Sequence, residues 1–146
     1  MFQRILVVCI GNICRSPVAE AMLRARLPGK EFLSAGLGAR VNEGVEPTAR
    51  RLAEEVALEV SSHKARQLTP EMLQAADLIL VMSDGQRRAV AEMAPAALGK
   101  TMRLGCWLNE GKGKDIPDPY QKSQEVFEHV HQLMDDATRA WVSKLA

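Results

Sequence analysis

Residues Ile5 to Pro17 read ILVVCIGNICRSP, and this stretch determines the predicted fold. Its first five residues form a continuous apolar run, largely β-branched, which is typical of a strand buried on both faces of a parallel sheet. Ser16 and Pro17 then match the preferences for the N-cap and the first residue of a helix, and Pro28-Gly29 is expected to stop that helix. The stretch therefore predicts a strand, a short loop and a helix in direct succession.

The rest of the chain continues this alternation. Further strands are predicted over residues 32–35, 77–82 and 101–104. Helices are predicted from Pro47 with Leu52 and Val56 on the inner face, from Thr69-Pro70, after Ser83, and from Ser123 to the end of the chain. Strands that alternate with helices predict one α/β domain over residues 1–146. Its architecture would be doubly wound and flavodoxin-like, with a four-stranded parallel sheet flanked by helices.

Composition excludes several classes of protein. The 146 residues are 47% hydrophobic and 25% charged, with a formal net charge of +1, which is ordinary for a globular domain and argues against a nucleic-acid partner. No apolar run approaches the roughly 20 residues that a membrane span needs, so no membrane insertion is expected. Three cysteines, two of them in one loop, do not form a secreted disulfide framework, and they favour a reducing, cytoplasmic compartment.

The loop after the first strand is predicted to bind an anion. In doubly wound sheets, ligands lie beyond the carboxyl ends of the strands, and Cys9 ends the first strand. Backbone N–H groups and the helix dipole give such a loop partial positive charge before any side chain is counted. The predicted phosphate-binding residues are Ile10, Gly11, Asn12, Ile13, Cys14, Arg15 and Ser16.

The side chains of this loop suit phosphoryl chemistry. Gly11 and Asn12 tolerate the backbone geometry of a tight turn, and the planar fork of Arg15 fits two phosphate oxygens. The same positive field favours the thiolate of Cys9, which would lie beneath the bound anion in position for attack on phosphorus. Ser16 is placed to donate a hydrogen bond to that sulfur. Cys9 is accordingly the candidate nucleophile.

Cleavage of a phosphate ester also requires an acid for the leaving oxygen. The stretch DIPDPYQKS, residues 115–123, offers Asp118 between two prolines with Tyr120 close by, and flanking prolines would hold the carboxyl group at a fixed distance from a cleft. Composition alone explains Asp118 equally well as a solvated turn residue before the last helix. Both interpretations stay open at this point.

Four motifs together resemble the low-molecular-weight protein tyrosine phosphatases, and most closely the bacterial branch associated with exopolysaccharide export. They are VCIGNICRSPVAEAMLR (8–24), SAGLGA (34–39), SHKARQL (62–68) and IPDPYQKS (116–123). The resemblance implies hydrolysis of phosphotyrosine through a phosphocysteine on Cys9, with Arg15 binding the phosphate. It implies that Asp118 protonates the tyrosyl oxygen and then activates water, with no cofactor and no metal.

The resemblance also assigns supporting roles. The network that fixes the loop would consist of Asn12, Ser16, Ser34 and His63. Cys14 resembles a cysteine that protects the nucleophile by forming a reversible disulfide. Where eukaryotic members place an aromatic residue after the second strand, this chain reads GLGARVNEG. The wall of the substrate pocket is therefore expected from Leu37, Arg40 or the neighbouring Val41, together with Tyr120.

The implied partner is a tyrosine-phosphorylated protein, specifically a bacterial tyrosine kinase of polysaccharide export, and the implied assembly is a monomer or weak oligomer. Three alternative functions fit the sequence less well. A thioredoxin-coupled arsenate reductase needs two further cysteines in a mobile segment, and residues 82–93 contain none. A phosphocysteine carrier needs neither a loop arginine nor a remote acid, and a catalytically inactive phosphotyrosine-binding module has no use for Cys9, Arg15 and Asp118 together.

Overall fold

A parallel sheet in the order β2-β1-β3-β4 forms the centre of the computed structural model, which describes residues 2–146. The strands are β1 (Arg4–Cys9), β2 (Glu31–Gly36), β3 (Leu78–Val81) and β4 (Thr101–Arg103). The helices are α1 (Arg15–Arg26), α2 (Pro47–Glu55), α3 (Pro70–Ala75), α4 (Asp84–Met93), the 3₁₀ helix η1 (Pro95–Lys100) and α5 (Gln124–Leu145). The predicted four-stranded, doubly wound α/β fold is confirmed.

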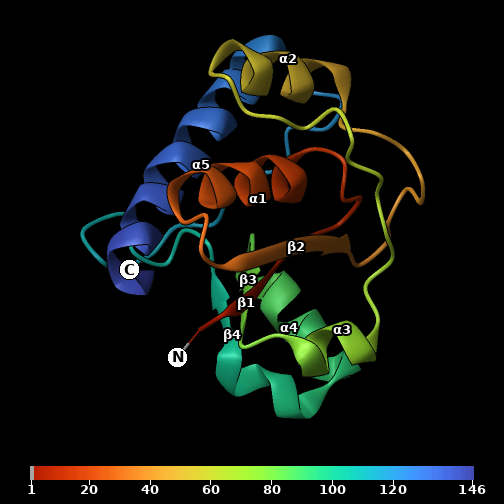
Figure 1. Cartoon of the computed structure of the whole chain (residues 1–146), viewed down its shortest axis with the longest axis vertical. Coiled ribbons are helices and arrows are strands. Elements are labelled where there is room, and N and C mark those ends of the chain that lie inside the picture. The colour runs from red at the N-terminus through yellow and green to blue at the C-terminus, as the bar shows by residue number, and fades with distance from the viewer. Residues whose placement is uncertain (1) are drawn as a thin grey trace.

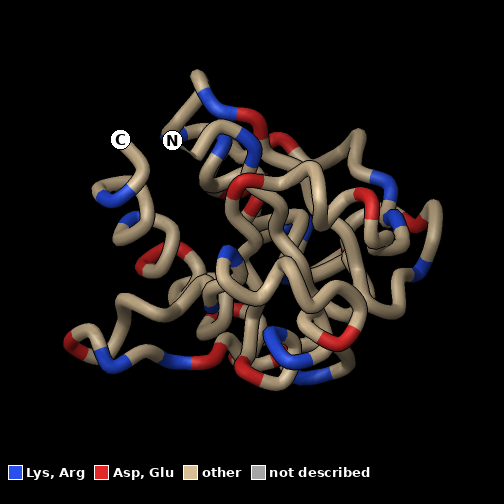
Figure 2. The backbone as a smooth tube through the Cα atoms, turned by 90° about the horizontal axis from the view of Figure 1, so that it is seen from below, with Lys and Arg blue, Asp and Glu red and all other residues tan. Residues whose placement is uncertain are grey.

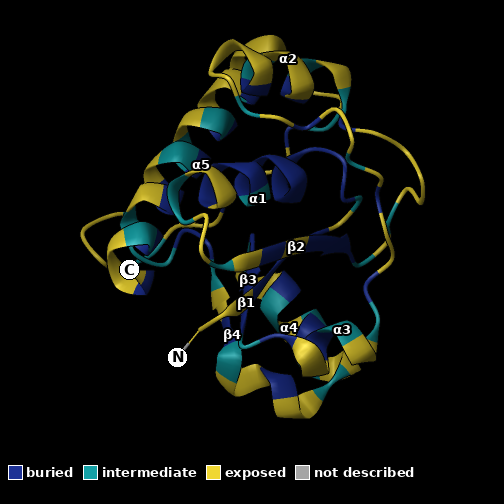
Figure 3. Cartoon of the chain, viewed as in Figure 1, coloured by how far each residue is buried: buried dark blue, intermediate teal, exposed yellow. Residues whose placement is uncertain are grey.

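Helices cover the sheet on both faces (Figure 1). Helices α1, α2 and α5 contact one another on one face, while α3 and α4 lie on the other. Alternating residues of β1 divide between the two layers: Ile5 and Val7 join the apolar cluster of α1 and α5, and Leu6 and Val8 join that of α3 and α4. The central strands β1 (after Arg4) and β3 and the inner face of α1 are accordingly buried, whereas the edge strands β2 and β4 are exposed in part (Figure 3).

The topology places the loop after β1 at the switch point of the sheet. From β1 the chain passes to β2 on one side, and it returns later to β3 on the other side. The connections that leave β1 and β3 therefore run in opposite directions and open a crevice beyond the carboxyl end of β1, where Cys9 pairs with Gly36. The predicted anion loop lies in that crevice.

Most of the predicted helix starts are confirmed. Thr69, Ser83 and Ser123 each accept a hydrogen bond from a backbone N–H of the first turn, at 3.2 to 3.3 Å. The inner face predicted for α2 is partly wrong, because Val56 lies beyond the last helical residue and is 58% exposed. Ala49 and Ala53 are the buried residues of that helix, and their small side chains allow it to pack closely on its neighbours.

Charged residues of both signs are interspersed along the tube of the backbone (Figure 2). This distribution agrees with the near-zero net charge and differs from the single-sign stripe of a nucleic-acid-binding face. None of the helices in residues 2–146 combines the length and the apolar character needed to cross a bilayer.

Candidate active site

Helix α1 begins earlier than the sequence predicts. Its first residue is Arg15, and Cys14 occupies the N-cap position without a side-chain hydrogen bond to the helix. The prediction that Ser16 caps the helix is wrong: Ser16 lies fully buried inside the first turn, and its hydroxyl contacts the Cys9 sulfur at 2.8 Å instead. A helix start without a side-chain cap leaves its N–H groups available to an anion.

Asn12 organises the loop. Its backbone adopts φ +60°, in the left-handed region that asparagine tolerates, and its side chain is fully buried. The amide nitrogen donates to Ser16 Oγ at 2.8 Å and to Ser34 Oγ at 3.0 Å. The amide oxygen accepts from the backbone N–H of Arg66 at 2.9 Å, which fixes the orientation of the amide group. Three separate segments of chain thus hold one side chain.

His63 completes this network from the loop between α2 and α3. Its Nε2 lies 2.7 Å from the backbone oxygen of Asn12, and because a carbonyl only accepts, Nε2 must carry the hydrogen. The structure therefore brings together the four polar residues predicted to support the loop, with Ser34 contributed by β2.

The hydrogen-bond directions around Cys9 follow from the same network. Since Ser16 Oγ already accepts from Asn12, its own hydrogen is free to point at the Cys9 sulfur 2.8 Å away. The backbone N–H of Asn12 donates to the same sulfur at 3.3 Å. Two donors that converge on one sulfur stabilise its anionic form. Both contacts hold the Cys9 sulfur at the end of β1, facing the loop.

Arg15 and Asp118 meet across the cleft. Arg15 is only 4% exposed, and its Nη1 donates to the backbone oxygen of Ile116 at 2.8 Å. Its Nη2 lies 3.8 Å from Asp118 Oδ2, whose side chain is 51% exposed. The backbone N–H of Tyr120 donates to the other Asp118 oxygen at 3.1 Å. The contact with Arg15 places Asp118 at the cleft and favours its role at the site over the solvated-turn interpretation.

The cleft around these groups has a volume of about 190 Å³. It is lined by Cys9, Ile10, Gly11, Ile13, Cys14, Arg15, Gly38, Arg40, Asp118 and Tyr120. Leu37, which was expected in the pocket wall, packs instead against the apolar cluster of α3 and α4, and Gly38 takes its place in the lining. Arg40 and Tyr120 lie in the wall as expected.

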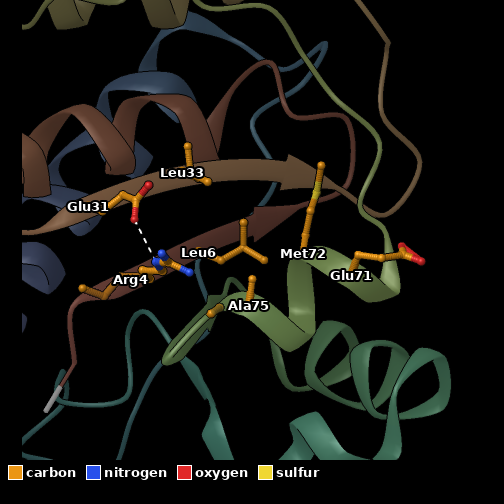
Figure 4. Close-up of a pocket in the computed structure, with 9 residues that line it drawn as sticks. Arg4, Leu6, Glu31, Leu33, Glu71, Met72 and Ala75 are labelled. Atoms are coloured by element: carbon orange, nitrogen blue, oxygen red, sulfur yellow. Dashed lines mark ion pairs between the residues drawn. The ribbon is translucent and has the colours of Figure 1, made fainter.

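A larger cavity of about 310 Å³ lies at the opposite end of β1 (Figure 4). Its walls are mostly aliphatic, with Leu6, Leu33 and Met72 around it and an Arg4–Glu31 ion pair of 3.2 Å at its edge. The lining residues include no nucleophile. Chemistry rather than volume therefore identifies the cleft of Cys9 as the candidate active site. Elsewhere among residues 2–146, no cluster of metal-ligating side chains is found.

Cys14 differs chemically from Cys9, although both line the cleft. Burial, with smaller contributions from the nearby carboxylate of Glu46 and the Cys9 sulfur, raises the pKa of the Cys14 thiol to about 12. Cys14 is therefore a protonated thiol at neutral pH. Of the two sulfurs, only Cys9 has the hydrogen-bond donors of a reactive thiolate.

Sequence reasoning missed two residues that shape the loop. A Cβ on Gly36 would lie 2.4 Å from the backbone oxygen of Ile10, so only glycine lets β2 approach the loop this closely. Arg66 contributes its backbone N–H to the loop amide, and a backbone contact leaves no trace in residue type. A glycine that ends a buried strand is the one signal that could have been noticed.

The fold and the site together define a class: a doubly wound α/β protein with an anion-binding loop at its switch point, a cysteine at the floor of that loop, and an arginine and a carboxylate beside it. The family model "Low molecular weight phosphotyrosine protein phosphatase" matches residues 4–146. The chain belongs to the low-molecular-weight protein tyrosine phosphatase family, and it is a hydrolase of that kind, as the resemblance of its motifs predicted.

Individual members of the family are similar to this chain over nearly its full length. The low-molecular-weight protein-tyrosine-phosphatase Wzb of Escherichia coli (strain K12) is 46% identical over 145 residues, which cover 99% of this chain and 97% of the relative. The crystal structure of the tyrosine phosphatase Wzb from Escherichia coli K30 in complex with sulphate matches with a TM-score of 0.95 and 43% identity, covering both chains completely.

A third match extends the chemistry of this fold. The YwlE arginine phosphatase from Geobacillus stearothermophilus is similar with a TM-score of 0.91 and 33% identity, covering 99% of this chain and 93% of that one. The same architecture thus supports cleavage of phosphate from a different side chain. The residues that line the cleft must therefore decide the substrate.

Replacing Asn12 with alanine is expected to lower kcat about 10- to 100-fold, because the loop loses the amide that orients Ser16 and meets Ser34. Steady-state kinetics with an aryl phosphate measure this. Asn42 is the matched control, since it is exposed but also has positive φ, +72°. Asn42→Ala should leave kcat within about twofold of wild type. Equal losses in both variants would show that backbone strain, and not the network, is responsible.

Proposed function

We propose that this chain removes phosphate from tyrosine residues of proteins through a covalent phosphocysteine on Cys9. One observation carries the proposal: the Cys9 sulfur receives two hydrogen bonds at the floor of a cleft that also contains Arg15 and Asp118. In this proposal the loop is the anion site, Cys9 the nucleophile and Asp118 the acid, all within one cavity.

In the first step the Cys9 thiolate attacks phosphorus and forms the S–P bond. The P–O bond to the tyrosyl oxygen breaks, and that oxygen leaves with the bonding electrons and takes a proton from the Asp118 carboxyl group. Arg15 binds the equatorial phosphate oxygens. Its anchoring bond to the Ile116 carbonyl aims the guanidinium without using all of its donors.

In the second step water attacks the phosphocysteine, and the Asp118 carboxylate accepts its proton. The S–P bond breaks, inorganic phosphate leaves, and the Cys9 thiolate is regenerated. The Ser16 hydroxyl, held 2.8 Å from the sulfur, stabilises the negative charge that returns to it. Asp118 ends the cycle protonated, as it began.

The lining of the cleft favours the phenyl ring of phosphotyrosine over the guanidinium of phosphoarginine as the leaving group. Its wall contains the aliphatic side chains of Ile10 and Ile13 and the ring of Tyr120, which suit a phenyl ring. The test is phosphate release from one peptide sequence that carries phosphotyrosine, phosphoserine or phosphoarginine. Release from phosphotyrosine alone supports the proposal. Preferential release from phosphoarginine would instead indicate an arginine phosphatase, like the similar protein from Geobacillus stearothermophilus.

We further propose that the physiological substrate is a bacterial tyrosine kinase of polysaccharide export, and that the reaction takes place in the cytoplasm. Support comes from the sequence motifs and from the full-length similarity to Wzb. The three free cysteines fit a reducing compartment.

A second proposal within this function gives Cys14 the role of a redox guard. Peroxide converts the Cys9 thiolate to a sulfenic acid and releases hydroxide. The Cys14 sulfur then attacks the Cys9 sulfur; the disulfide forms, and the Cys14 proton leaves with the sulfenic hydroxyl as water. Oxidation also removes the negative charge of Cys9, one of the groups that raise the pKa of Cys14.

Peroxide is therefore expected to inactivate the wild type reversibly and Cys14→Ser irreversibly, as measured by activity recovered after addition of a thiol. Because the Cys14 pKa lies near 12, the thiolate fraction and the rate of disulfide closure should rise about tenfold per pH unit from about pH 6 to 8. Cys106→Ser is the control and should recover like wild type. Full recovery of Cys14→Ser would exclude the guard.

A further inference from the structure

Arg40 connects the two loops that form the mouth of the cleft. Its backbone N–H donates to the backbone oxygen of Gly11 at 3.0 Å. Its Cγ and Cδ lie 3.8 and 3.9 Å from the position that a Cβ on Gly11 would take. Its Nη1 donates to the Tyr120 hydroxyl at 3.0 Å, with the guanidinium carbon 5.6 Å from the centre of that ring. The methylene stem therefore forms part of the wall, and the charged end crosses the mouth.

The guanidinium of Arg40 does not use all of its N–H donors within the described part of the chain. Its Nε contacts both carboxylate oxygens of Glu43 at 3.0 Å, and the hydrogen bond with Glu43 raises the pKa of Arg40, so the charge is permanent. Across residues 2–146, Nη2 of Arg40 makes no hydrogen bond, and the side chain is 48% exposed. The Arg40 cation, with N–H groups that have no partner among these residues, therefore lies at the entrance that the substrate must pass.

The acidic groups around the mouth already have partners. Glu43 is held by Arg40, and Glu46 caps α2 by accepting from the backbone N–H groups of Thr48 and Ala49 at 2.6 and 3.0 Å. Asp118 faces Arg15. Each of these carboxylates thus has a cationic or N–H partner, whereas Nη2 of Arg40 keeps its donors free of the residues that the structure describes, and that nitrogen is complementary to an anion on the substrate.

We propose that Arg40 is a specificity residue that selects phosphotyrosines with a second anionic group, a carboxylate or a phosphate, within about two residues along the peptide. The inference rests on the proposed function, since it concerns the same cleft. The shared chemistry is a charge-assisted hydrogen bond from the guanidinium to an oxyanion, and an exposed contact of this kind is expected to change kcat/KM about threefold to tenfold.

Three phosphotyrosine peptides test this, identical except that the residues flanking the phosphotyrosine are asparagine, aspartate or phosphoserine. The measured quantity is the ratio of kcat/KM for each acidic peptide to that for the asparagine peptide, within one variant, which cancels general effects on catalysis. Wild type should prefer both acidic peptides, and Arg40→Gln should bring both ratios to about 1. Glu43→Gln should enlarge them. Arg88→Gln removes the same charge from the exposed surface of α4 and should keep the wild-type ratios.

The outcomes separate the two proposals. Wild-type ratios near 1, or ratios that persist in Arg40→Gln, would overturn the role of Arg40 while phosphotyrosine hydrolysis stands. Preference for the phosphoserine peptide alone would support the role with a phosphate as the anion, and preference for the aspartate peptide alone would support it with a carboxylate. No release from any peptide would overturn the proposed function and this inference with it.

Discussion

Cys9→Ser is expected to lower kcat for aryl phosphates by more than about a thousandfold while the fold and phosphate binding remain intact. Serine keeps the size of the side chain and the contact with Ser16, but its hydroxyl is a far weaker nucleophile than a thiolate at neutral pH. Single-turnover and steady-state phosphate release measure the loss. The variant should also retain a phosphorylated kinase long enough to be isolated with it, which tests the proposed partner directly.

The control for this variant is Cys106→Ser, since Cys106 is partly exposed and lies outside the cleft. It should keep kcat within about twofold of wild type. Activity in Cys9→Ser above about a tenth of wild type would remove Cys9 from the role of nucleophile. A matching loss in Cys106→Ser would indicate a defect of folding rather than of chemistry.

The sequence predicted what depends on residue type and order. A β-branched run before a Gly-Asn loop was sufficient to predict β1 and to propose an anion site after it. Buried strands require apolar, β-branched residues, and phosphate loops require residues that tolerate a tight turn. Caps such as Ser83 were predicted for the same reason. The polar network around Asn12 came from the resemblance, and the structure brings its members together.

What the sequence could not predict depends on contacts between distant segments. Ser16 has the residue type of an N-cap, but the helix begins one residue before it, and its hydroxyl bonds the Cys9 sulfur and the Asn12 amide instead. Arg40 was expected in the wall of the pocket, but its residue type could not predict which groups its charge would contact. In the structure its methylene groups pack against Gly11, and its guanidinium donates to the Tyr120 hydroxyl. Tyr120 lies 80 residues further along the chain, so the sequence could not predict this contact.

Asp118→Asn is expected to lower kcat/KM, which reports the step that forms the phosphocysteine, about 10²- to 10⁴-fold for an aryl phosphate with a poor leaving group such as phenolate, and much less for p-nitrophenolate. Asparagine preserves the shape of the side chain and can still accept from the Tyr120 N–H, so the loop should keep its conformation. It has no acidic proton to give. The tyrosyl oxygen must then leave as an unprotonated anion, which a good leaving group tolerates and a poor one does not.

The measurement is the slope of log(kcat/KM) against leaving-group pKa across a series of substituted phenyl phosphates. Wild type should give a shallow slope and Asp118→Asn a steep negative one, with the lines converging at the most acidic phenols. Asp115→Asn is the matched control, because Asp115 lies in the same loop, paired with Arg103 at 3.0 Å and outside the cleft. It should reproduce the wild-type slope. Parallel lines for wild type and Asp118→Asn would mean that the proton comes from elsewhere, and that the contact between Asp118 and Arg15 serves only to shape the cleft.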